Sequence, residues 1–344
     1  MEKTLSLIIP TYNMERYLDY CLSSLIVDGQ LMDMLEVLVV NDGSKDRSSE
    51  IAHGYEARYP AVFRVIDKDN GNYGSCVNVG VREATGKYVK VLDADDSFDT
   101  QNFAGFLAFM KDRDEDLILS DFDIVNEERI VQKEVRYPFE GEKTYKFSEI
   151  GSTEAFGLME MHAVTYKRAK LLEMDYRQTE GISFTDQQWI FAPMTQIETI
   201  CFYARPVYKY LVGRAGQTMD PAIQAKQKSQ LIKCLYGMVD AYSVWKNKVD
   251  ESHLAYLHAR LRPLVKGVYL SCFTNHKGDG KQLLAEFDET LRSKDMDLYN
   301  YIGSHDVSSI AGFDYIAFWR KHYKSHQILT GMFYSLITLL LKIK

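Results

Sequence analysis

Residues 87–96 read KYVKVLDADD, a short apolar segment that runs directly into three carboxylates. The apolar half is typical of a β-strand, and in an α/β sheet ligands bind beyond the carboxyl ends of the strands. The side chains of Asp93, Asp95 and Asp96 repel one another unless a cation or a bound partner offsets their charge. The stretch therefore predicts one strand of an α/β sheet with a site for a hard cation at its end.

The residues around this stretch alternate between strand and helix patterns. Near-continuous apolar runs are typical of strands buried on both faces of a parallel sheet. Such runs occupy residues 5–9, 35–40, 63–66 and 116–125. Apolar residues at helical spacing occupy residues 17–26, 51–55 and 77–84. Alternation at this rhythm implies an α/β fold, a doubly wound and mostly parallel sheet with helices on both faces.

The bulk composition limits the class of protein. With 344 residues and 46% hydrophobic content, the chain can form one large core, or a domain of roughly 200–250 residues plus a smaller one. The net charge of −7 disfavours a nucleic-acid partner, because such proteins normally carry a basic surface. Five scattered cysteines without a Cys-x-x-Cys pair indicate reduced thiols and a cytoplasmic location. The first residues lead directly into a strand, so no signal peptide is expected.

Polar groups follow each of the first four predicted strands, and a doubly wound sheet brings such strand ends to one crevice. The groups are Thr11-Tyr12-Asn13, Asp42-Gly43-Ser44, Asp69-Asn70-Gly71 and Asp93 to Asp96. The ring of Tyr12 can lie along a flat base, and Asp42 can accept a hydrogen bond from a ring N–H. Gly71 and Gly74 would let the backbone approach a ligand. The acids suit Mg²⁺ or Mn²⁺, so the set predicts a site for a nucleotide diphosphate that carries a cation.

Each group has an ordinary explanation when it is taken alone. Tyr12 is then a core residue, and Asp42-Gly43-Ser44 is a turn. The pair Gly71 and Gly74 does not make a dinucleotide-binding fingerprint, and the acids from Asp93 onward could form a solvated cluster at a helix N-terminus. Four such groups in this order, each after a strand, favour the nucleotide site over coincidence.

The same segments resemble the successive motifs of family 2 inverting glycosyltransferases, which have the GT-A fold. The resemblance is carried by Pro10-Thr11-Tyr12-Asn13, Asn41-Asp42-Gly43-Ser44-x-Asp46, Asn70-Gly71 to Asn78-x-Gly80, and Leu92-Asp93-Ala94-Asp95-Asp96. It is strong over residues 4–100 and thin after about residue 215. It implies a GT-A domain over residues 1–215, with a nucleotide-binding half (1–100) and an acceptor half (101–215).

The resemblance also implies the donor and metal residues. Tyr12 and Asp42 match the positions that contact the nucleoside, commonly uracil, so a UDP-sugar is the expected donor. Asp93 and Asp95 match the acids that contact the ribose and the metal, with Asp95 as the direct ligand of Mn²⁺ or Mg²⁺ and Asp96 as a substitute. The whole donor set is Pro10, Thr11, Tyr12, Asp42, Asn70, Gly71, Asp93, Asp95 and Arg214.

An acceptor hydroxyl needs a general base on the face of the sugar opposite the leaving group. Asp186 is the candidate, a lone acid in a polar turn that precedes an apolar segment. The family usually has a Glu-Asp pair here with the Asp as base, whereas this chain has Thr185 in place of the Glu. The alternative is that Asp186 caps a helix beginning near Gln187. Glu180 and Asp175 are then the fallback bases.

Two further positions have open interpretations. Residues 210–218 resemble a late family segment near the pyrophosphate, where Arg214 would pair with phosphate oxygens. An ordinary surface arginine is the alternative. His162 either faces the acceptor pocket or is a core residue whose hydrogen bonds are satisfied.

The chain from residue 216 to 344 has a helical pattern and includes an apolar tail at residues 328–341. The tail is shorter than the roughly 20 apolar residues of a bilayer span. Basic residues flank it, which suits the interface of an anionic leaflet. The tail either packs back on the core or contacts the inner face of the cell membrane through residues 328–344, and we expect the membrane contact.

The expected function is that of a metal-dependent inverting glycosyltransferase of the hexosyltransferase type. It would move a sugar from a nucleotide sugar to a hydroxyl of a glycan or lipid-linked acceptor in cell-envelope polysaccharide synthesis. A sugar-nucleotide nucleotidyltransferase is the second hypothesis, but it calls for a Gly- and Lys/Arg-rich loop after the first strand, where this chain reads YNMER at residues 12–16. A non-catalytic scaffold with the same fold is the third, and loss of the metal acids or of the base would favour it.

Overall fold

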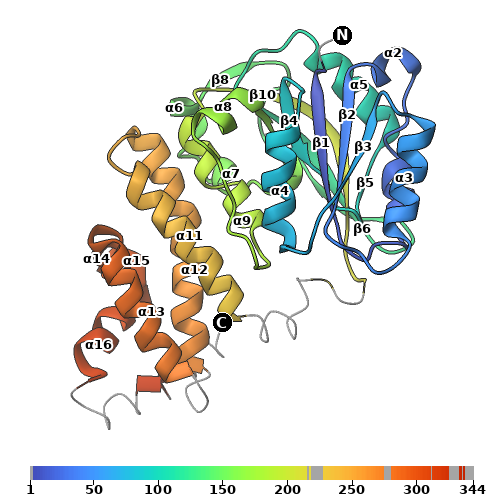
Figure 1. Cartoon of the computed structure of the whole chain (residues 1–344). Helices are drawn as coiled ribbons and strands as arrows, with labels where there is room; N and C mark the ends of the chain where they lie inside the picture. The colour runs from blue at the N-terminus through green and yellow to red at the C-terminus, as the bar shows by residue number, and fades with distance from the viewer. Residues whose placement is uncertain are drawn as a thin grey trace. The chain divides into compact units, whose positions relative to one another are not determined.

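The computed structural model describes residues 3–214, 217, 228–274, 280–310, 312–324, 333–334 and 336–337 (Figure 1). The chain divides into two compact units. Unit 1 comprises Met1–Cys234 and Asp250–His253, and unit 2 comprises Leu235–Val249 and Leu254–Lys344. The division falls within helix α11 (Lys228–Trp245). The predicted boundary near residue 215 lies beside residues outside the described ranges and stays a prediction.

Unit 1 is built on a mixed sheet with the strand order β3-β2-β1-β4-β9-β6-β10-β5, in which β7 pairs with β6 and β8 with β10. The strands are β1 (Leu5–Thr11), β2 (Leu35–Asn41), β3 (Phe63–Asp67), β4 (Tyr88–Val91), β5 (Ser97–Phe98), β6 (Leu117–Val125), β7 (Val131–Val135), β8 (Thr144–Lys146), β9 (Val164–Lys167) and β10 (Thr199–Leu211). The first four run parallel, as do β6 and β10, and β9 joins the two groups in antiparallel pairing. The α/β fold predicted from the sequence is confirmed.

Helices cover both faces of the sheet, as predicted (Figure 1). Residues of α1 (Leu18–Ser23), α2 (Gly29–Met32), α3 (Ser48–Arg58) and α5 (Thr100–Met110) share one core with Leu7, Ile9 and Val37. On the opposite face, α4 (Asn72–Glu83) packs on β1, where a Cβ at Gly80 would come within 2.4 Å of Ile8. Glycine at position 80 therefore sets how closely this helix approaches the sheet.

The register of the parallel strands places the predicted strand ends at one level. β1 and β2 pair from Leu5 with Leu35 to Thr11 with Asn41, and every residue of both strands is buried. Burial on both faces explains why these strands read as continuous apolar runs. The loops that follow Thr11 and Asn41 consequently start side by side.

The acceptor half has strands and short helices that the sequence pattern did not indicate. β7 reads VQKEV and is mostly exposed, while β10 bends at register shifts around Pro206. Short elements connect these strands: α6 (Phe147–Ile150), α7 (Glu154–Gly157), the 3₁₀ turn η1 (Met161–Ala163), α8 (Arg168–Glu173), α9 (Asp186–Trp189) and the 3₁₀ turn η2 (Ala192–Gln196). Exposed edge strands and one-turn helices carry little hydrophobic periodicity, so the pattern could not locate them.

Unit 2 is helical, as predicted for the C-terminal part. Besides the end of α11 it contains α12 (Glu251–Thr274) from Leu254 on, α13 (Gly280–Lys294), α14 (Met296–Gly303), α15 (His305–Ser308), the strands β11 (Ser309–Ile310) and β12 (Phe313–Asp314), and α16 (Tyr315–His322). The buried carboxylate of Asp288 on α13 accepts hydrogen bonds from Tyr269, Tyr299 and Arg320 and so joins α12, α14 and α16 to α13. Within the described ranges, every helix is too short or too polar to cross a membrane.

The apolar tail is described at four positions only. Phe333, Tyr334 and Ile337 are buried, whereas Leu336 is 45% exposed. The ring of Phe333 packs edge-on against Phe273, and the hydroxyl of Tyr334 accepts a hydrogen bond from the indole of Trp319 at 3.0 Å. At these positions the tail packs within unit 2. The other residues of 328–344 lie outside the described ranges, so the membrane contact stays a prediction.

Candidate functional site

A cavity of about 490 Å³ opens at the carboxyl ends of β1 and β4. A volume of this size is typical of pockets for small molecules. Six of the sequence-predicted site residues line it: Pro10, Tyr12, Asp93, Asp95, Asp186 and Arg214. The fold thus brings together groups from the first strand end, the acid cluster, the acceptor half and the end of β10.

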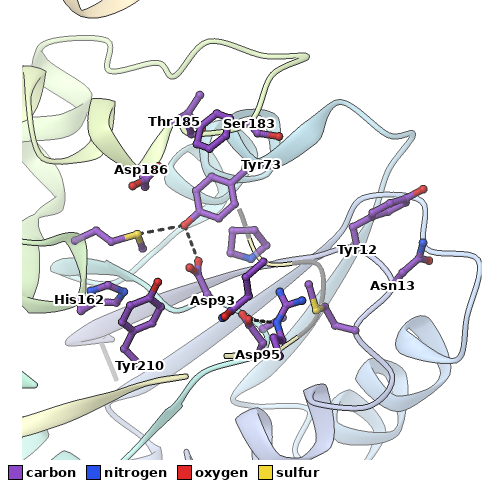
Figure 2. Close-up of a pocket in the computed structure, with 17 residues that line it drawn as sticks. Tyr12, Asn13, Tyr73, Asp93, Asp95, His162, Ser183, Thr185, Asp186 and Tyr210 are labelled. Atoms are coloured by element: carbon purple, nitrogen blue, oxygen red, sulfur yellow. Dashed lines mark hydrogen bonds and ion pairs between the residues drawn. The ribbon is translucent and has the colours of Figure 1, made fainter. Parts of the chain in front are cut away.

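The predicted donor, metal and base residues occupy different parts of this cavity (Figure 2). Figure 2 shows Tyr12 at one end of the group and Asp186 with His162 at the other. Asp93 and Asp95 lie between them. A ligand that extended from Tyr12 to Asp186 would therefore pass the acids.

Tyr12 is held at the rim by hydrogen bonds between the first two loops. The backbone N–H of Asn13, a residue with φ of 53°, donates to the hydroxyl of Ser44 at 3.1 Å. The N–H of Lys45 donates to the side-chain carbonyl of Asn13 at 2.8 Å. These contacts explain why an Asn follows Tyr12 and a Ser follows Gly43, and they leave the Tyr12 ring 46% exposed.

Asp42 lies beside the cavity but does not line it in the described part of the chain. Its carboxylate is almost fully buried and accepts hydrogen bonds from Lys68 at 2.5 Å and from the backbone N–H groups of Gly71 and Asn72, both at 2.9 Å. Asn70 in turn donates to the carbonyl of Asp42 at 3.0 Å. Asp42 thus fixes the loop that begins α4, and its contact with a base stays a prediction.

Thr11, Asn70 and Gly71 likewise do not contribute to the described cavity wall. The hydroxyl of Thr11 is buried and donates to the carbonyl of Ile9 at 3.1 Å. The close approach expected at Gly74 is to the chain itself, because a Cβ there would come within 2.4 Å of the carbonyl oxygen of Thr179. The expectation that Gly74 serves a ligand was therefore wrong, since the space is filled by backbone.

That backbone contact positions the segment that carries Asp186. Asn78 on α4 donates to the carbonyl of Gln178 at 3.0 Å and accepts from its N–H at 2.7 Å. The N–H of Gly181 donates to the carbonyl of Gly71 at 2.9 Å. The motif from Asn70 to Gly80 thereby docks residues 178–181 on α4, five residues before the candidate base.

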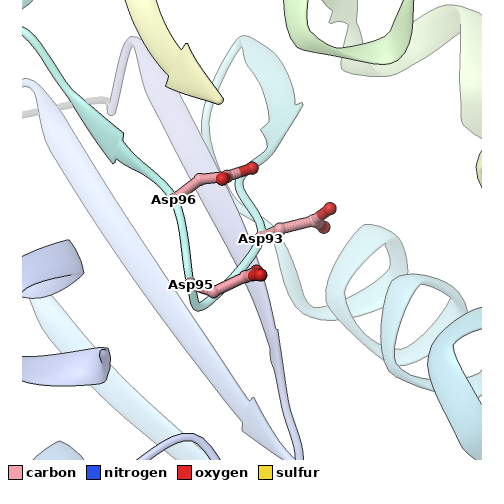
Figure 3. Close-up of side chains that lie close together, drawn as sticks. All are labelled: Asp93, Asp95 and Asp96. Carbon is pink, nitrogen blue, oxygen red and sulfur yellow. The ribbon is translucent and has the colours of Figure 1, made fainter. Parts of the chain in front are cut away.

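The three acids after β4 present one oxygen each within 4.8 Å of one another (Figure 3). They differ in what they contact. Asp96 is fully buried and accepts hydrogen bonds from the hydroxyl of Tyr208 and the N–H of Leu211, both at 2.6 Å. Both partners belong to β10, so Asp96 anchors that strand and does not line the cavity.

Asp93 faces the cavity and accepts a hydrogen bond from the hydroxyl of Tyr73 at 2.7 Å (Figure 2). Burial and the neighbouring charge of Asp95 raise the pKa of Asp93 to about 7, although the Tyr73 hydroxyl opposes the rise. The negative charge of Asp186 contributes to the same rise. The acid cluster and the candidate base are thus electrostatically coupled.

Asp95 is 8% exposed and forms an ion pair with Arg214, whose Nε lies 2.5 Å from Oδ2. The guanidinium of Arg214 also lies over the ring of Tyr17, 5.5 Å from its centroid. The carbonyl of Asp95 accepts hydrogen bonds from both terminal nitrogens of Arg129 at 3.2 Å. Two arginines therefore surround the acid that the sequence indicated as the metal ligand.

The donor set suits a hard divalent cation. Carboxylate oxygens are the ligands that Mg²⁺ and Mn²⁺ prefer, and two of the three acids, Asp93 and Asp95, face the cavity. Asp96 is engaged by β10, which makes it the least available of the three. Asp93 and Asp95 are thus the residues that would hold such an ion.

Asp186 lines the cavity as the first residue of the one-turn helix α9. It is not the cap of that helix: the N-cap position is Thr185, and no side-chain capping hydrogen bond is formed. Burial raises the pKa of Asp186, while a hydrogen bond from Gln187 and the nearby His162 oppose the rise. The hydroxyl of Thr185 is fully buried and has no hydrogen-bond partner among the described residues.

The fallback bases lie elsewhere. Asp175 is exposed in a turn and pairs with Arg177 at 3.3 Å, and Glu180 accepts a hydrogen bond from Asn78 at 2.9 Å. Both line a separate cavity of about 150 Å³ beside α4 and α8. Of the three candidate bases, Asp186 is the one that shares a cavity with the acid cluster.

The sequence interpretation left one residue of the cavity wall open and missed others. His162, left open between core and pocket, is only 6% exposed but lines the cavity with its ring stacked on Tyr210 at 4.1 Å. Tyr73 and Met161 also line it. Tyr73 falls inside the motif that follows Asn70, which was the one available signal. The others come from the weakly patterned acceptor half.

Lys90, in the stretch that leads to the acids, is buried without an acidic partner among the described contacts. Its ammonium group donates to the carbonyls of His162 at 2.6 Å and Val164 at 3.2 Å. These carbonyls lie beyond the point where β4 and β9 stop pairing. Lys90 therefore links β4, the strand that leads to the acids, to the segment that carries His162. Burial lowers the pKa of Lys90 to about 7.

This shift predicts a pH-dependent stability. Between pH 7 and the ordinary lysine pKa of 10.5 the unfolded chain holds a proton that the folded protein has lost, so stability should rise with pH. Lys90 is expected to add up to ~1.4 kcal/mol to the free energy of unfolding per pH unit. Urea unfolding of the wild type and Lys90→Met at pH 7 and pH 9 measures it. The free energy of unfolding of Lys90→Met should rise less from pH 7 to pH 9 than that of the wild type. An equal rise in both proteins would contradict the lowered pKa of Lys90.

Comparison with known proteins identifies related sequences. Residues 6–163 match Glycosyl transferase family 2. A protein of Mycoplasma pneumoniae, described as an uncharacterized glycosyltransferase MG025 homolog, is 41% identical over 95 residues, covering 27% of this chain and 31% of that protein. TarS of Staphylococcus aureus, a poly(ribitol-phosphate) beta-N-acetylglucosaminyltransferase, is 26% identical over 218 residues, covering 63% of this chain and 37% of TarS. The chain thus spans about a third of the length of these relatives.

Solved structures share the fold. The crystal structure of residues 1–349 of S. aureus TarS in complex with UDP-GlcNAc has a TM-score of 0.62 at 19% identity, and the match covers 92% of this chain and 91% of that one. The mannosyltransferase PcManGT from Pyrobaculum calidifontis, in complex with GDP-Man and Mn²⁺, has a TM-score of 0.50 at 14% identity and coverage of 100% and 87%. At these identities the likeness is one of fold.

Proposed function

We propose, on the premise that this chain belongs to glycosyltransferase family 2 and has the GT-A fold, that it transfers a sugar from a nucleotide-sugar donor to a hydroxyl with inversion at the anomeric carbon. The observation that carries the proposal is the composition of one cavity. Its wall combines two carboxylates for a cation, Asp93 and Asp95, with a separate, partly buried carboxylate, Asp186. Asp93 and Asp95 would serve the leaving group through the cation, and Asp186 would serve the acceptor hydroxyl.

The donor is a UDP-sugar in this proposal. The exposed ring of Tyr12 offers a stacking surface for the base at the rim, and Arg214 offers a guanidinium for the diphosphate. Pro10 lines the same part of the cavity, while Thr11, Asp42, Asn70 and Gly71 shape the loops behind it. TarS, which shares the fold, is described in complex with UDP-GlcNAc, and this supports the choice of nucleotide.

The reaction is a single displacement. The acceptor oxygen forms a bond to the anomeric carbon, the bond from that carbon to the diphosphate oxygen breaks, and the hydroxyl proton passes to Asp186. A divalent cation bound at Asp93 and Asp95 would neutralise charge on the leaving diphosphate. Arg214 would share that charge.

The acceptor is a hydroxyl of a glycan or a lipid-linked glycan in cell-envelope polysaccharide synthesis. The relative TarS is described as acting on poly(ribitol-phosphate), which is a polymer acceptor bearing hydroxyl groups. We further propose a cytoplasmic enzyme that contacts the membrane surface through residues 328–344. Burial of all five cysteines fits reduced thiols in that compartment.

A panel of nucleotide sugars tests the proposal. Calorimetry and hydrolysis assays with UDP-sugars, with and without Mn²⁺, should find metal-dependent binding and turnover of at least one UDP-sugar. Tyr12→Ala should weaken UDP binding by about 5- to 150-fold, because stacking on an aromatic ring contributes roughly 1–3 kcal/mol per base. Tyr12→Phe keeps the ring and is the matched control, with near wild-type affinity. Absence of binding by every nucleotide sugar would sink the proposal.

A further inference from the structure

We infer that Arg214 takes the place of a cation at Asp95 while the donor site is empty, so that the site selects a divalent cation in complex with a nucleoside diphosphate over the free cation. This makes Arg214 a specificity-determining residue for the form in which the donor enters. The inference rests on the proposed function, because it concerns the same acids and the same diphosphate.

The ion pair is short and shielded. Nε of Arg214 lies 2.5 Å from Oδ2 of Asp95, and the two side chains are 14% and 11% exposed. Both residues line the cavity. A charge-assisted bond of this kind is stronger where water is largely excluded. A cation that approaches Asp95 therefore meets a carboxylate that is already neutralised.

The chain around Arg214 holds it in this position. Asp96 fixes the end of β10 through the N–H of Leu211, three residues before the arginine. Gly213 turns the chain with φ of +94°, its N–H donates to the side-chain carbonyl of Gln217 at 2.9 Å, and the amide of Gln217 donates to the carbonyl of Leu211 at 2.6 Å. These hydrogen bonds tie Leu211 and Gly213, the residues just before the arginine, to the side chain of Gln217. The placement of its guanidinium over Tyr17 restricts Arg214 further.

The consequence follows from charge balance. A free divalent cation must displace the guanidinium from Asp95, and removing one partner of a buried pair without replacing it is unfavourable. A diphosphate brings oxygens that accept the guanidinium at the same time, since arginine pairs with phosphate as well as with carboxylate. Arg214 then exchanges one anion for another, and Asp95 becomes available to the cation that arrives with the diphosphate.

Binding of Mn²⁺ alone to the full chain, measured by calorimetry or by the Mn²⁺ electron paramagnetic resonance signal, tests the inference. Arg214→Met should bind free Mn²⁺ about tenfold more tightly than the wild type. Saturating UDP should tighten Mn²⁺ binding in the wild type by a larger factor than in Arg214→Met, because the variant has no ion pair to release. The double variant Arg214→Met/Asp95→Asn should lose the gain.

Arg129→Met is the matched control. It removes the same charge beside Asp95, but the guanidinium of Arg129 binds the backbone carbonyl of Asp95 and leaves the carboxylate untouched. Equal gains in Arg129→Met and Arg214→Met would show a general charge effect and overturn the inference. Unchanged or weaker binding of free Mn²⁺ by Arg214→Met would do the same. If Arg214→Met gains Mn²⁺ affinity as expected while no form binds UDP, the competition at Asp95 stands and the proposed function fails.

Discussion

Replacing Asp186 with asparagine is expected to lower kcat by about 10²–10⁴-fold, the usual contribution of a positioned general base. Asparagine keeps the shape of the side chain in the cavity but cannot accept the proton of the acceptor hydroxyl. Donor binding should stay intact, because the cation acids and Tyr12 are unchanged. The measurement is kcat with an active UDP-sugar, beside the affinity of the variant for UDP and Mn²⁺.

The control for this variant is Asp175→Asn. Asp175 is the fallback base, is exposed in a turn with φ of 48° that asparagine adopts readily, and lines a different cavity. Its replacement should leave kcat near the wild-type value. Undiminished turnover by Asp186→Asn would refute the base assignment, and a large loss in Asp175→Asn would transfer the role to that residue.

The pH dependence gives an independent check on Asp186. Burial raises its pKa above that of an ordinary aspartate, and the base acts only when ionised. Activity should therefore fall as the pH drops through this raised value, higher than the roughly 3.9 of a free side chain. The same shift means that ionisation costs the folded protein stability at high pH, so Asp186→Asn should be no less stable than the wild type at pH 8. A loss of activity in Asp186→Asn at pH 8 would therefore not result from unfolding.

Asp95→Asn is expected to lower metal-dependent turnover by about 10²–10⁴-fold, which corresponds to several kcal/mol of lost charge stabilisation in the transition state. It should also weaken Mn²⁺ binding in the presence of UDP. The isosteric change removes the anion that pairs with Arg214 and faces the cavity. Turnover with and without Mn²⁺, together with Mn²⁺ titration, measures both effects.

Asp69→Asn is the matched control for Asp95→Asn. Asp69 is an exposed acid at the neighbouring strand end and does not line the described cavity. Its replacement should leave turnover and Mn²⁺ affinity near the wild-type values. Full metal-dependent activity in Asp95→Asn would remove Asp95 from the cation site. The remaining acid that faces the cavity, Asp93, would then be the ligand to test.

The nucleotide-binding half was predictable because its signals are local. β1, β2 and β4 are buried on both faces and read as apolar runs, and each loop at a strand end carries residues required by its own geometry. Asn13 and Ser44 bond to one another across two such loops, and Gly80 allows α4 to reach the sheet. The residues of each motif lie close together in the chain, so the motifs can be recognised from the sequence even though Asn13 contacts Ser44, 31 positions away.

The acceptor half was not predictable to the same extent. β7 is an exposed edge strand, β10 bends at Pro206, and α9 has a single turn, so none has a clear period. Asp186 was found through a resemblance rather than through a pattern. His162 stayed ambiguous, because its neighbours in sequence do not reveal that its ring stacks on Tyr210, which belongs to β10.

By itself, the sequence determined the parallel half of the sheet, the four strand ends and the position of the acid cluster, because each depends on residues close together in the chain. Only the tertiary structure decided what each acid contacts. Asp42 is engaged by the backbone at the start of α4 and Asp96 by β10, while Asp95 pairs with Arg214 from 119 positions later in the chain. Partners this distant are set by strand order and packing. The physical reason is that burial and pairing depend on all neighbours in space, of which the local sequence specifies only a part.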